Sequence, residues 1–494
     1  MNNWKKRLGK GLSDNKVVLL FAILCIGAIA VAGKPLTFVA GELFTRIGRN
    51  SFIVLALIIP VLAGLGLNFG ITIGAIAAQI AIFCVVYWGF TGIGGFLLAL
   101  LIATPLAVLF GWLIGVVFNK MKGAEMIGGM VLGYFADGLY QLLFLFVIGG
   151  VIPVHNPTLI ITGGVGVKNT IDLKDNLKYA LDGISLLTIV EVAFYAVIAV
   201  TALTLIIRLC TKKPVNWGKS IAILVGAAVA YALTFIPAIE AFLNQNGILL
   251  LSAVELAVAF TVLYQLGCIL YHKLIKKSEK FRWKRSVAAI LAAGVFYALT
   301  YIPAIEEVLL YVTLPAMTYL CIIGLCIFNT ALMKTRLGQN MRTVGQSRTV
   351  ANSAGINVNR TRILAMVFST VLASWGQLIS LQNLGTFSTY GAHSQVGQFA
   401  IAALLVGGAS VQKATNKQAI MGVILFHTLF IISPQAGQAL FSSAQIGEYF
   451  RVFVAYGVIA VSLAMHAWKT HAKPKLIVAG KVPSPGEAAK ALEE

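Results

Sequence analysis

Charged residues are scarce in this chain, and acidic residues are the scarcest. Only 11% of the 494 residues are charged and just 17 are acidic, whereas 59% are hydrophobic. A soluble globular protein carries about 25% charged residues. The composition therefore excludes an ordinary soluble protein and indicates an integral membrane protein.

Motifs that would perform chemistry are also missing. The six histidines are scattered, and the sequence has no H-E-x-x-H, no C-x-x-C and no G-x-x-x-x-G-K-[ST] phosphate loop. The cysteines lack the spacing of a zinc site or a disulfide framework, so we interpret them as small core residues. They are Cys25, Cys84, Cys210, Cys268, Cys321 and Cys326. We expect no catalytic residue, no metal site and no cofactor on this chain, which cannot hydrolyse ATP by itself.

Long apolar runs fill most of the chain. Residues 51–119 contain no Asp, Glu, Lys or Arg, and about 20 apolar residues suffice to span a bilayer as a helix. The runs predict an all-α polytopic bundle of about fourteen transmembrane helices, in which 398–412 is short enough to be re-entrant. The predicted spans are 17–33, 51–69, 71–89, 93–118, 126–151, 184–208, 220–239, 247–271, 286–304, 310–333, 363–382, 398–412, 418–434 and 450–468.

Basic residues divide unevenly between the two sides of these spans. Thirty of the 38 Lys and Arg residues fall on one side, which is typical of cytoplasmic loops. With both termini in the cytoplasm, every basic cluster lies inside and the segment 152–183 lies outside. We expect a cytoplasmic segment 1–16, a transmembrane domain 17–468 and a cytoplasmic tail 469–494. A nucleic-acid-binding protein would gather its basic residues in a polar domain, so no nucleic-acid partner is expected.

An internal repeat lengthens the chain. Residues 217–243 and 283–309 match at 15 of 27 positions, and LLTIVEVA (186–193) is echoed by LLSAVELA (250–257). A helix pair within 184–304 has therefore been duplicated. Because the duplicate adds an even number of spans, it does not invert the segments that follow.

The stretch KTRLGQNMRTVGQSRTVANSAGINVNRTR (334–362) is a polar loop between two apolar segments. It carries six basic and no acidic residues, so we expect it in the cytoplasm. Residues 343–354 can form one short helix that ends at Gly355. The small residues of its expected face are Val350, Ala351 and Ala354. Such a face allows another protein to approach closely, so we predict a docking loop.

Part of this loop, TVGQSRTVANSAGINVNRTRI, resembles the ATPase-coupling loop of ABC-transporter permeases of the branched-chain amino-acid, ribose and nucleoside family. Thr349 stands where many members carry the Glu of a Glu-Ala-Ala triplet, so a contact through that acid is not expected here. The resemblance covers roughly 51–151 and 310–468. It implies that an ATPase contacts Gly345, Arg348, Val350, Ala351, Ala354, Gly355 and Ile356.

The resemblance implies a permease subunit of an ATP-driven importer in the cell membrane of a prokaryote. Its partners would be cytosolic ATPase subunits, an extracellular or periplasmic substrate-binding protein, a second permease subunit and membrane lipid. EMIGGMVLGYFA (125–136) and GLNFG (66–70) are similar to segments of nucleoside and simple-sugar permeases, although Gly133 replaces an Asn. The expected solute is a small polar molecule, with a nucleoside or simple sugar favoured over a branched-chain amino acid.

Polar residues inside the apolar runs mark the expected solute pathway. Asp137 lies mid-span, where a charged side chain costs about 2.5–3.5 kcal/mol, so it should face the bundle interior or water. A protonated Asp137, hydrogen-bonded within the bundle, is the alternative. Buried amides can likewise bind a solute or join two helices. The predicted pathway residues are Asn68, Gln79, Asp137, Gln377 and Gln382, together with Gly407 and Gly408, which are included because AIAALLVGGAS (400–410) resembles a segment of the family.

A secondary transporter driven by Na⁺ or H⁺ is the competing class. Asp137 and Glu191 would then be its coupling groups. Carriers of that class often have inverted halves, whereas the repeated segments here have the same orientation and lie in one half of the chain. A membrane enzyme is a third class, and the chain has no cluster of catalytic residues for it.

Overall fold

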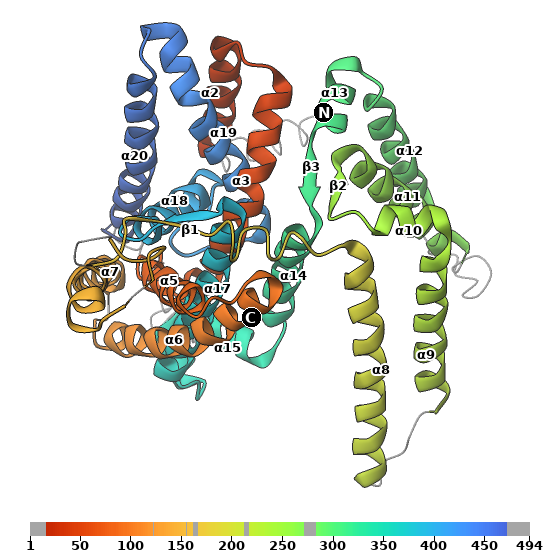
Figure 1. Cartoon of the computed structure of the whole chain (residues 1–494), viewed down its shortest axis with the longest axis horizontal. Helices are drawn as coiled ribbons and strands as arrows, with labels where there is room; N and C mark the ends of the chain where they lie inside the picture. Colours follow the sequence, from red (N-terminus) through yellow and green to blue (C-terminus); the bar gives the residue numbers. More distant parts are fainter. Residues whose placement is uncertain are drawn as a thin grey trace, which may run out of the picture.

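The chain forms an almost entirely helical protein with two visible parts. Our computed structural model describes residues 16–121, 123–154, 156–161, 166–211, 217–270 and 283–471. Figure 1 shows a main bundle and, beside it, a smaller group formed by α8 to α13. The predicted cytoplasmic segments 1–16 and 469–494 lie largely outside the described residues, as does the basic segment 272–285, which was also expected in the cytoplasm.

The first half of the main bundle precedes the smaller group in the chain. Its segments are helical because backbone N–H and C=O groups in hydrocarbon must form their hydrogen bonds within the segment itself. They are α2 (Lys16–Ala32), α3 (Leu36–Ala56), α4 (Ile58–Leu62), α5 (Ile71–Tyr87), α6 (Gly92–Lys120), α7 (Glu125–Leu142) and the wider turn η1 (Leu143–Val151).

The second half of the main bundle follows the smaller group and contains the predicted docking loop. Its helices are α14 (Ala316–Leu332), α15 (Arg336–Gln346), α16 (Arg348–Ser353), α17 (Val358–Leu384), α18 (Ala392–Val406), α19 (Asn416–Phe441) and α20 (Ala444–His471).

The two copies of the sequence repeat fold alike. In each copy a long helix is followed within two residues by a Thr whose hydroxyl donates to a carbonyl three residues earlier, Thr234 to Tyr231 and Thr300 to Tyr297, both at 2.6 Å. A proline then starts a short second helix, because proline is favoured in the first helical turn. The elements are α8 (Leu186–Cys210), α9 (Trp217–Ala232), η2 (Leu233–Phe235), α10 (Pro237–Leu243), α11 (Leu250–Leu270), α12 (Trp283–Leu299) and α13 (Pro303–Tyr311).

Two short antiparallel ribbons join distant segments. β2 (Gly247–Leu249) pairs with β3 (Thr313–Pro315), and Ile248 lies opposite Leu314. β1 (Thr170–Asp172) pairs with β4 (Thr386–Ser388), and Ile171 lies opposite Phe387. The second ribbon attaches the predicted external segment to the end of α17, while the first attaches the repeat region to the start of α14.

Helix α17 lies at the centre of the main bundle, where it packs against α3, α5 and α6. Small residues allow this close approach. A Cβ atom on Gly111 would lie 2.8 Å from Val367 Cα, and one on Gly115 would lie 2.9 Å from Ile363 Cα. Spacing of four residues puts both glycines on one face of α6, which is the usual small-residue pattern of membrane helix pairs.

The described helices support a polytopic membrane protein and alter some predicted boundaries. By length and composition, seven can cross a membrane, or nine if two bent pairs each count as one span. The expected span 51–69 differs from the structure in its limits, because the apolar helical segment that overlaps it runs from Leu36 to Leu62. It begins earlier since its charged residues are paired, as in the 3.8 Å contact of Glu42 with Arg46. The number of fourteen spans and the cytoplasmic location of both termini remain predictions.

Cysteine labelling in intact cells will test the predicted orientation. Thr170 in β1 is exposed, and Lys413 is exposed in a basic cluster between α18 and α19. In a background without the six native cysteines, an impermeant maleimide should label Thr170→Cys and spare Lys413→Cys until the cells are opened. Labelling of only Lys413→Cys in intact cells would reverse the predicted orientation of the chain.

Candidate functional site

A buried polar cluster surrounds Asp137 on α7. Asp137 Oδ1 lies 2.5 Å from His393 Nε2 and accepts a 3.1 Å hydrogen bond from Gln141 Nε2. His393 Nδ1 lies 3.0 Å from Gln79 Oε1. Gln79 and His393 are fully buried, whereas 22% of the Asp137 side chain is exposed. The structure therefore brings together two predicted pathway residues, Gln79 and Asp137, through a histidine that sequence analysis missed.

A small pocket opens beside this cluster, and we call it the Asp137 pocket. Its volume is about 160 Å³, and it lies between α5, α7, α18 and α20. The Tyr456 hydroxyl donates a 2.6 Å hydrogen bond to Gln398 Oε1 at its edge. Asp137 Oδ2 has no hydrogen-bond partner among the described residues. The pocket is lined by Phe69, Thr72, Met130, Gly133, Tyr134, Asp137, Ser394, Gly397, Gln398, Ile401, Tyr456 and Ile459.

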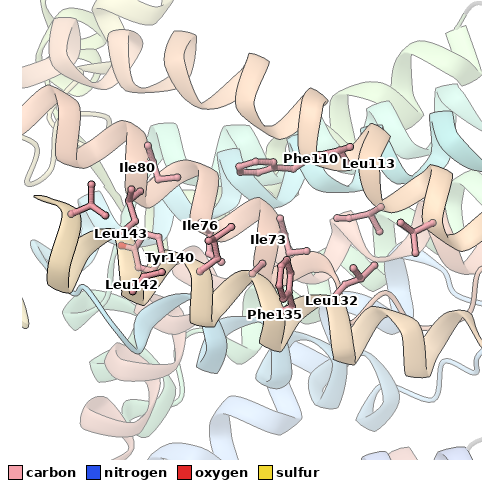
Figure 2. A pocket seen from close by; sticks show the side chains of 15 residues that line it. Ile73, Ile76, Ile80, Phe110, Leu113, Leu132, Phe135, Tyr140, Leu142 and Leu143 are labelled. Carbon is pink, nitrogen blue, oxygen red and sulfur yellow. The ribbon is translucent and has the colours of Figure 1, made fainter. Parts of the chain in front are cut away.

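Figure 2 shows a different cavity, of about 440 Å³, between α5, α6, α7 and η1. Its wall consists of aliphatic and aromatic side chains such as Ile76 and Phe110, and Tyr140 supplies its hydroxyl-bearing ring. A polar solute would lose hydrogen bonds to water in this space without replacing them. The cavity is therefore unsuited to a polar solute.

Gln382 is predicted to line the pathway, but the structure gives it a partner at one end of α17. Its Nε2 donates to Asp182 Oδ2 at 2.9 Å, and the same oxygen accepts from Asn383 Nδ2 at 2.9 Å. Asp182 Oδ1 accepts from Thr318 at 2.5 Å, and Arg49 donates to Asn383 Oδ1 at 2.6 Å. This network ties the segment before α8 to α3, α14 and α17.

The other predicted pathway residues lie apart from the Asp137 pocket. Asn68 is buried and donates to Ser369 Oγ at 3.2 Å. Gln377 is buried, and its amide has no hydrogen-bond partner in the described part of the chain. A Cβ on Gly407 would lie 1.9 Å from Gln418 O, so this glycine lets α18 approach α19. Gly408 has φ +83°, a conformation that favours glycine.

The docking loop differs from the predicted single helix over 343–354. That prediction is wrong, because α15 ends at Gln346 and α16 begins at Arg348. Ser347 separates them with φ −158° and accepts a 3.3 Å hydrogen bond from Val350 N, which caps α16. The predicted end is confirmed, since Gly355 follows α16 with φ +75°.

The loop has an inner and an outer face. Ala351 is fully buried, and a Cβ on Gly345 would lie 2.2 Å from Leu62 O, so both face the chain's own helices rather than a partner. Val350 is 60% exposed, and Gly355 is exposed too. A cleft of about 610 Å³ runs beside them and is lined by Arg348, Thr349, Asn352, Gly355, Ile356, Asn357, Val358 and Asn359. Ala354 is also exposed.

A buried ion-pair cluster joins this loop to the first residue of α7. Glu125 Oε1 contacts Arg348 Nη2 and lies 2.5 Å from Arg362 Nη2. Its Oε2 accepts a 2.9 Å hydrogen bond from Gly123 N. Arg362 is fully buried and also donates to Phe118 O at 3.3 Å. Sequence analysis placed Arg348 at the docking loop, but it did not identify Glu125 as its partner.

Helix α7 therefore carries the ion-pair cluster at one end and the Asp137 pocket further along. Twelve residues separate Glu125 from Asp137, which corresponds to about 18 Å of α-helix at 1.5 Å per residue. Arg348 and Arg362 therefore connect the docking loop directly to the helix that lines the pocket.

Comparisons with known proteins identify a family for the second part of the chain, which includes the docking loop and α18. Residues 192–463 match the family described as the permease component of the branched-chain amino acid transport system. A probable ABC transporter permease protein, y4mJ of Sinorhizobium fredii, is 33% identical over 107 residues. That alignment covers 21% of this chain and 32% of the relative, so the chain spans about a third of the relative's length. No solved structure matches the chain.

Proposed function

Because the chain belongs to the family of branched-chain amino acid transport system permease components, we propose that it is the membrane-spanning subunit of an ATP-driven importer. Cytosolic ATPase subunits would bind the docking loop, and an external binding protein would deliver a small polar solute. A nucleoside or simple sugar is favoured over a branched-chain amino acid. Two permease subunits, identical or similar, would form the pathway.

The observation that carries this proposal is the connection from docking loop to pocket. The docking loop (334–362) carries six basic and no acidic residues, and the Glu125 cluster links its helix α16 to the helix that bears Asp137. Closure of an ATPase pair would move α16 and bias the helices between outward and inward access. A bistable element of this kind allows ATP-driven closure at the docking loop to change the state of a distant pocket.

A tryptophan on the exposed face of α16 tests the docking loop. Val350→Trp should abolish co-purification of the ATPase and ATP-driven uptake, because the larger side chain obstructs a close protein contact. Since Val350 is 60% exposed, the permease should still fold. Val229→Trp, on the 55% exposed Val229 of α9, is the matched control. Normal ATPase association and uptake in Val350→Trp would contradict docking at this face.

The Asp137 and His393 contact is the one observation that favours the alternative, an ion-driven carrier. Ionisable residues inside membranes often form proton relays. In that alternative the pair would exchange a proton during each transport cycle. The energy source separates the two functions, and its test is argued in the Discussion.

A further inference from the structure

The polar atoms of the Asp137 pocket point to one class of solute. We propose that this pocket binds the sugar ring of a neutral, hydroxyl-bearing solute and discriminates against zwitterionic amino acids. The inference rests on the proposed import function and adds the chemistry by which the permease itself recognises what it moves. The residues that carry this selectivity are Asp137, Ser394, Gln398, Tyr134 and Tyr456.

Asp137 presents a carboxylate oxygen that is ready to accept a hydrogen bond. Its Oδ1 is already engaged by His393 and Gln141, which fixes the carboxylate plane. Its Oδ2 has no partner among the described residues, and the side chain lines the pocket. Hydrogen bonds to a charged acceptor are stronger than neutral ones. A hydroxyl group of a sugar is a donor that suits this oxygen.

The remaining polar groups of the pocket are neutral. Ser394, Thr72 and Tyr456 supply hydroxyls, and Gln398 supplies an amide. These groups both donate and accept hydrogen bonds, as the hydroxyls of a sugar ring also do. Several ring hydroxyls could therefore be satisfied at once within the pocket.

The pocket lacks a counter-charge for an amino-acid carboxylate. Its described lining contains Asp137 but neither Lys nor Arg. A zwitterion would place its carboxylate in a partly dehydrated space beside an existing carboxylate. Burying a charge without a partner is strongly unfavourable, and like charges add repulsion. A neutral polyol avoids both penalties.

Size and shape also fit a single ring. Pockets for drug-sized ligands range over about 300–1,000 Å³, so the 160 Å³ pocket has room for one ring of the solute. Phe69, Met130 and Ile401 offer apolar surface for the C–H face of the ring. Tyr134 adds an aromatic face at the pocket's edge.

Equilibrium binding to the full-length permease in lipid nanodiscs tests the proposal. The probes are radiolabelled D-ribose, uridine and leucine, each measured without ATPase or binding protein. Ribose or uridine should bind, and excess leucine should not displace either. Binding of uridine alone would identify nucleosides as the source of the ring, and binding of ribose alone would identify free sugars.

Variants of the pocket residues test whether the solute binds in the Asp137 pocket. Asp137→Asn and Gln398→Leu should each weaken sugar binding about tenfold or more, as expected for the loss of one hydrogen bond to a charged or buried group. Tyr456→Phe, which keeps the ring, should weaken it less. Glu255→Gln, a neutralised acid on the exposed face of α11, and Tyr449→Phe, an exposed tyrosine of α20, are the matched controls.

Three results would overturn the inference. They are the absence of binding by both ribose and uridine, leucine binding that depends on Asp137, and sugar binding that is unchanged in both Asp137→Asn and Gln398→Leu. The proposed function is judged separately, by ATPase co-purification and ATP-driven uptake. A permease that imports a different solute with ATP would thus refute the pocket's assignment without refuting the transporter class.

Discussion

Replacing Glu125 with glutamine should destabilise the permease and disconnect ATP hydrolysis from transport. Arg362 is fully buried and would lose the carboxylate that balances its charge. Breaking one partner of a buried ion pair costs about 3–5 kcal/mol. The loss should appear as a lower midpoint of thermal or denaturant unfolding in a lipid environment. ATPase activity should persist while uptake falls, because Arg348 would also lose its contact with α7.

Two further variants separate charge from packing in this cluster. Adding Arg362→Met to Glu125→Gln should recover part of the lost stability, since no uncompensated charge then stays buried. Glu42→Gln is the matched control because the Glu42 and Arg46 pair is partly exposed, with a 3.8 Å contact. Such pairs contribute about 0–1 kcal/mol. An equal loss of stability in Glu125→Gln and Glu42→Gln would show that the buried cluster does not stabilise the fold more than an exposed ion pair does.

The second prediction with a large expected effect concerns the source of energy for uptake. Uptake by proteoliposomes that contain the permease and its ATPases should fall to background without ATP. It should continue when ionophores collapse the proton and sodium gradients. The physical reason is that the proposed function assigns ATP hydrolysis to partner chains at the docking loop, since this sequence has no phosphate-binding loop of its own. Transport is measured as accumulation of labelled solute inside the vesicles.

The opposite outcome would establish the ion-driven alternative. If uptake stops with the gradient and continues without ATP, the permease is a secondary transporter. Asp137→Asn would then abolish gradient-driven accumulation, because an amide cannot exchange a proton with His393. The same variant in an ATP-driven importer should keep its dependence on ATP, even where its affinity for the solute falls.

Much of the architecture was predictable because it follows from local composition. Each predicted apolar span overlaps a helix among the described residues, since hydrocarbon leaves the backbone few other ways to satisfy its hydrogen bonds. The duplication was visible as well, because 217–243 and 283–309 match at 15 of 27 positions. The span 36–62 was misplaced because Glu42, Arg46 and Arg49 look like loop residues until their partners are known.

The candidate site was only partly predictable. Asp137 and Gln79 were identified from polarity within apolar runs, and both lie in the cluster. His393 was missed because one histidine near the start of an apolar segment carries no periodic signal. Its role depends on the contact with Asp137, from which it is separated by 256 positions. Gln382 has the same sequence signal as Gln79, yet its amide joins α17 to Asp182.

The sequence by itself determined the membrane class, the helical segments, the duplicated pair and the basic loop, because each depends on neighbouring residues and on the surrounding solvent. Only the tertiary structure decided which polar residues meet. It turned Ala351 and Gly345 inward, joined Glu125 to Arg348 and Arg362, and gathered the Asp137 pocket from four helices. These contacts depend on helix packing between residues far apart in the chain, which local composition does not encode.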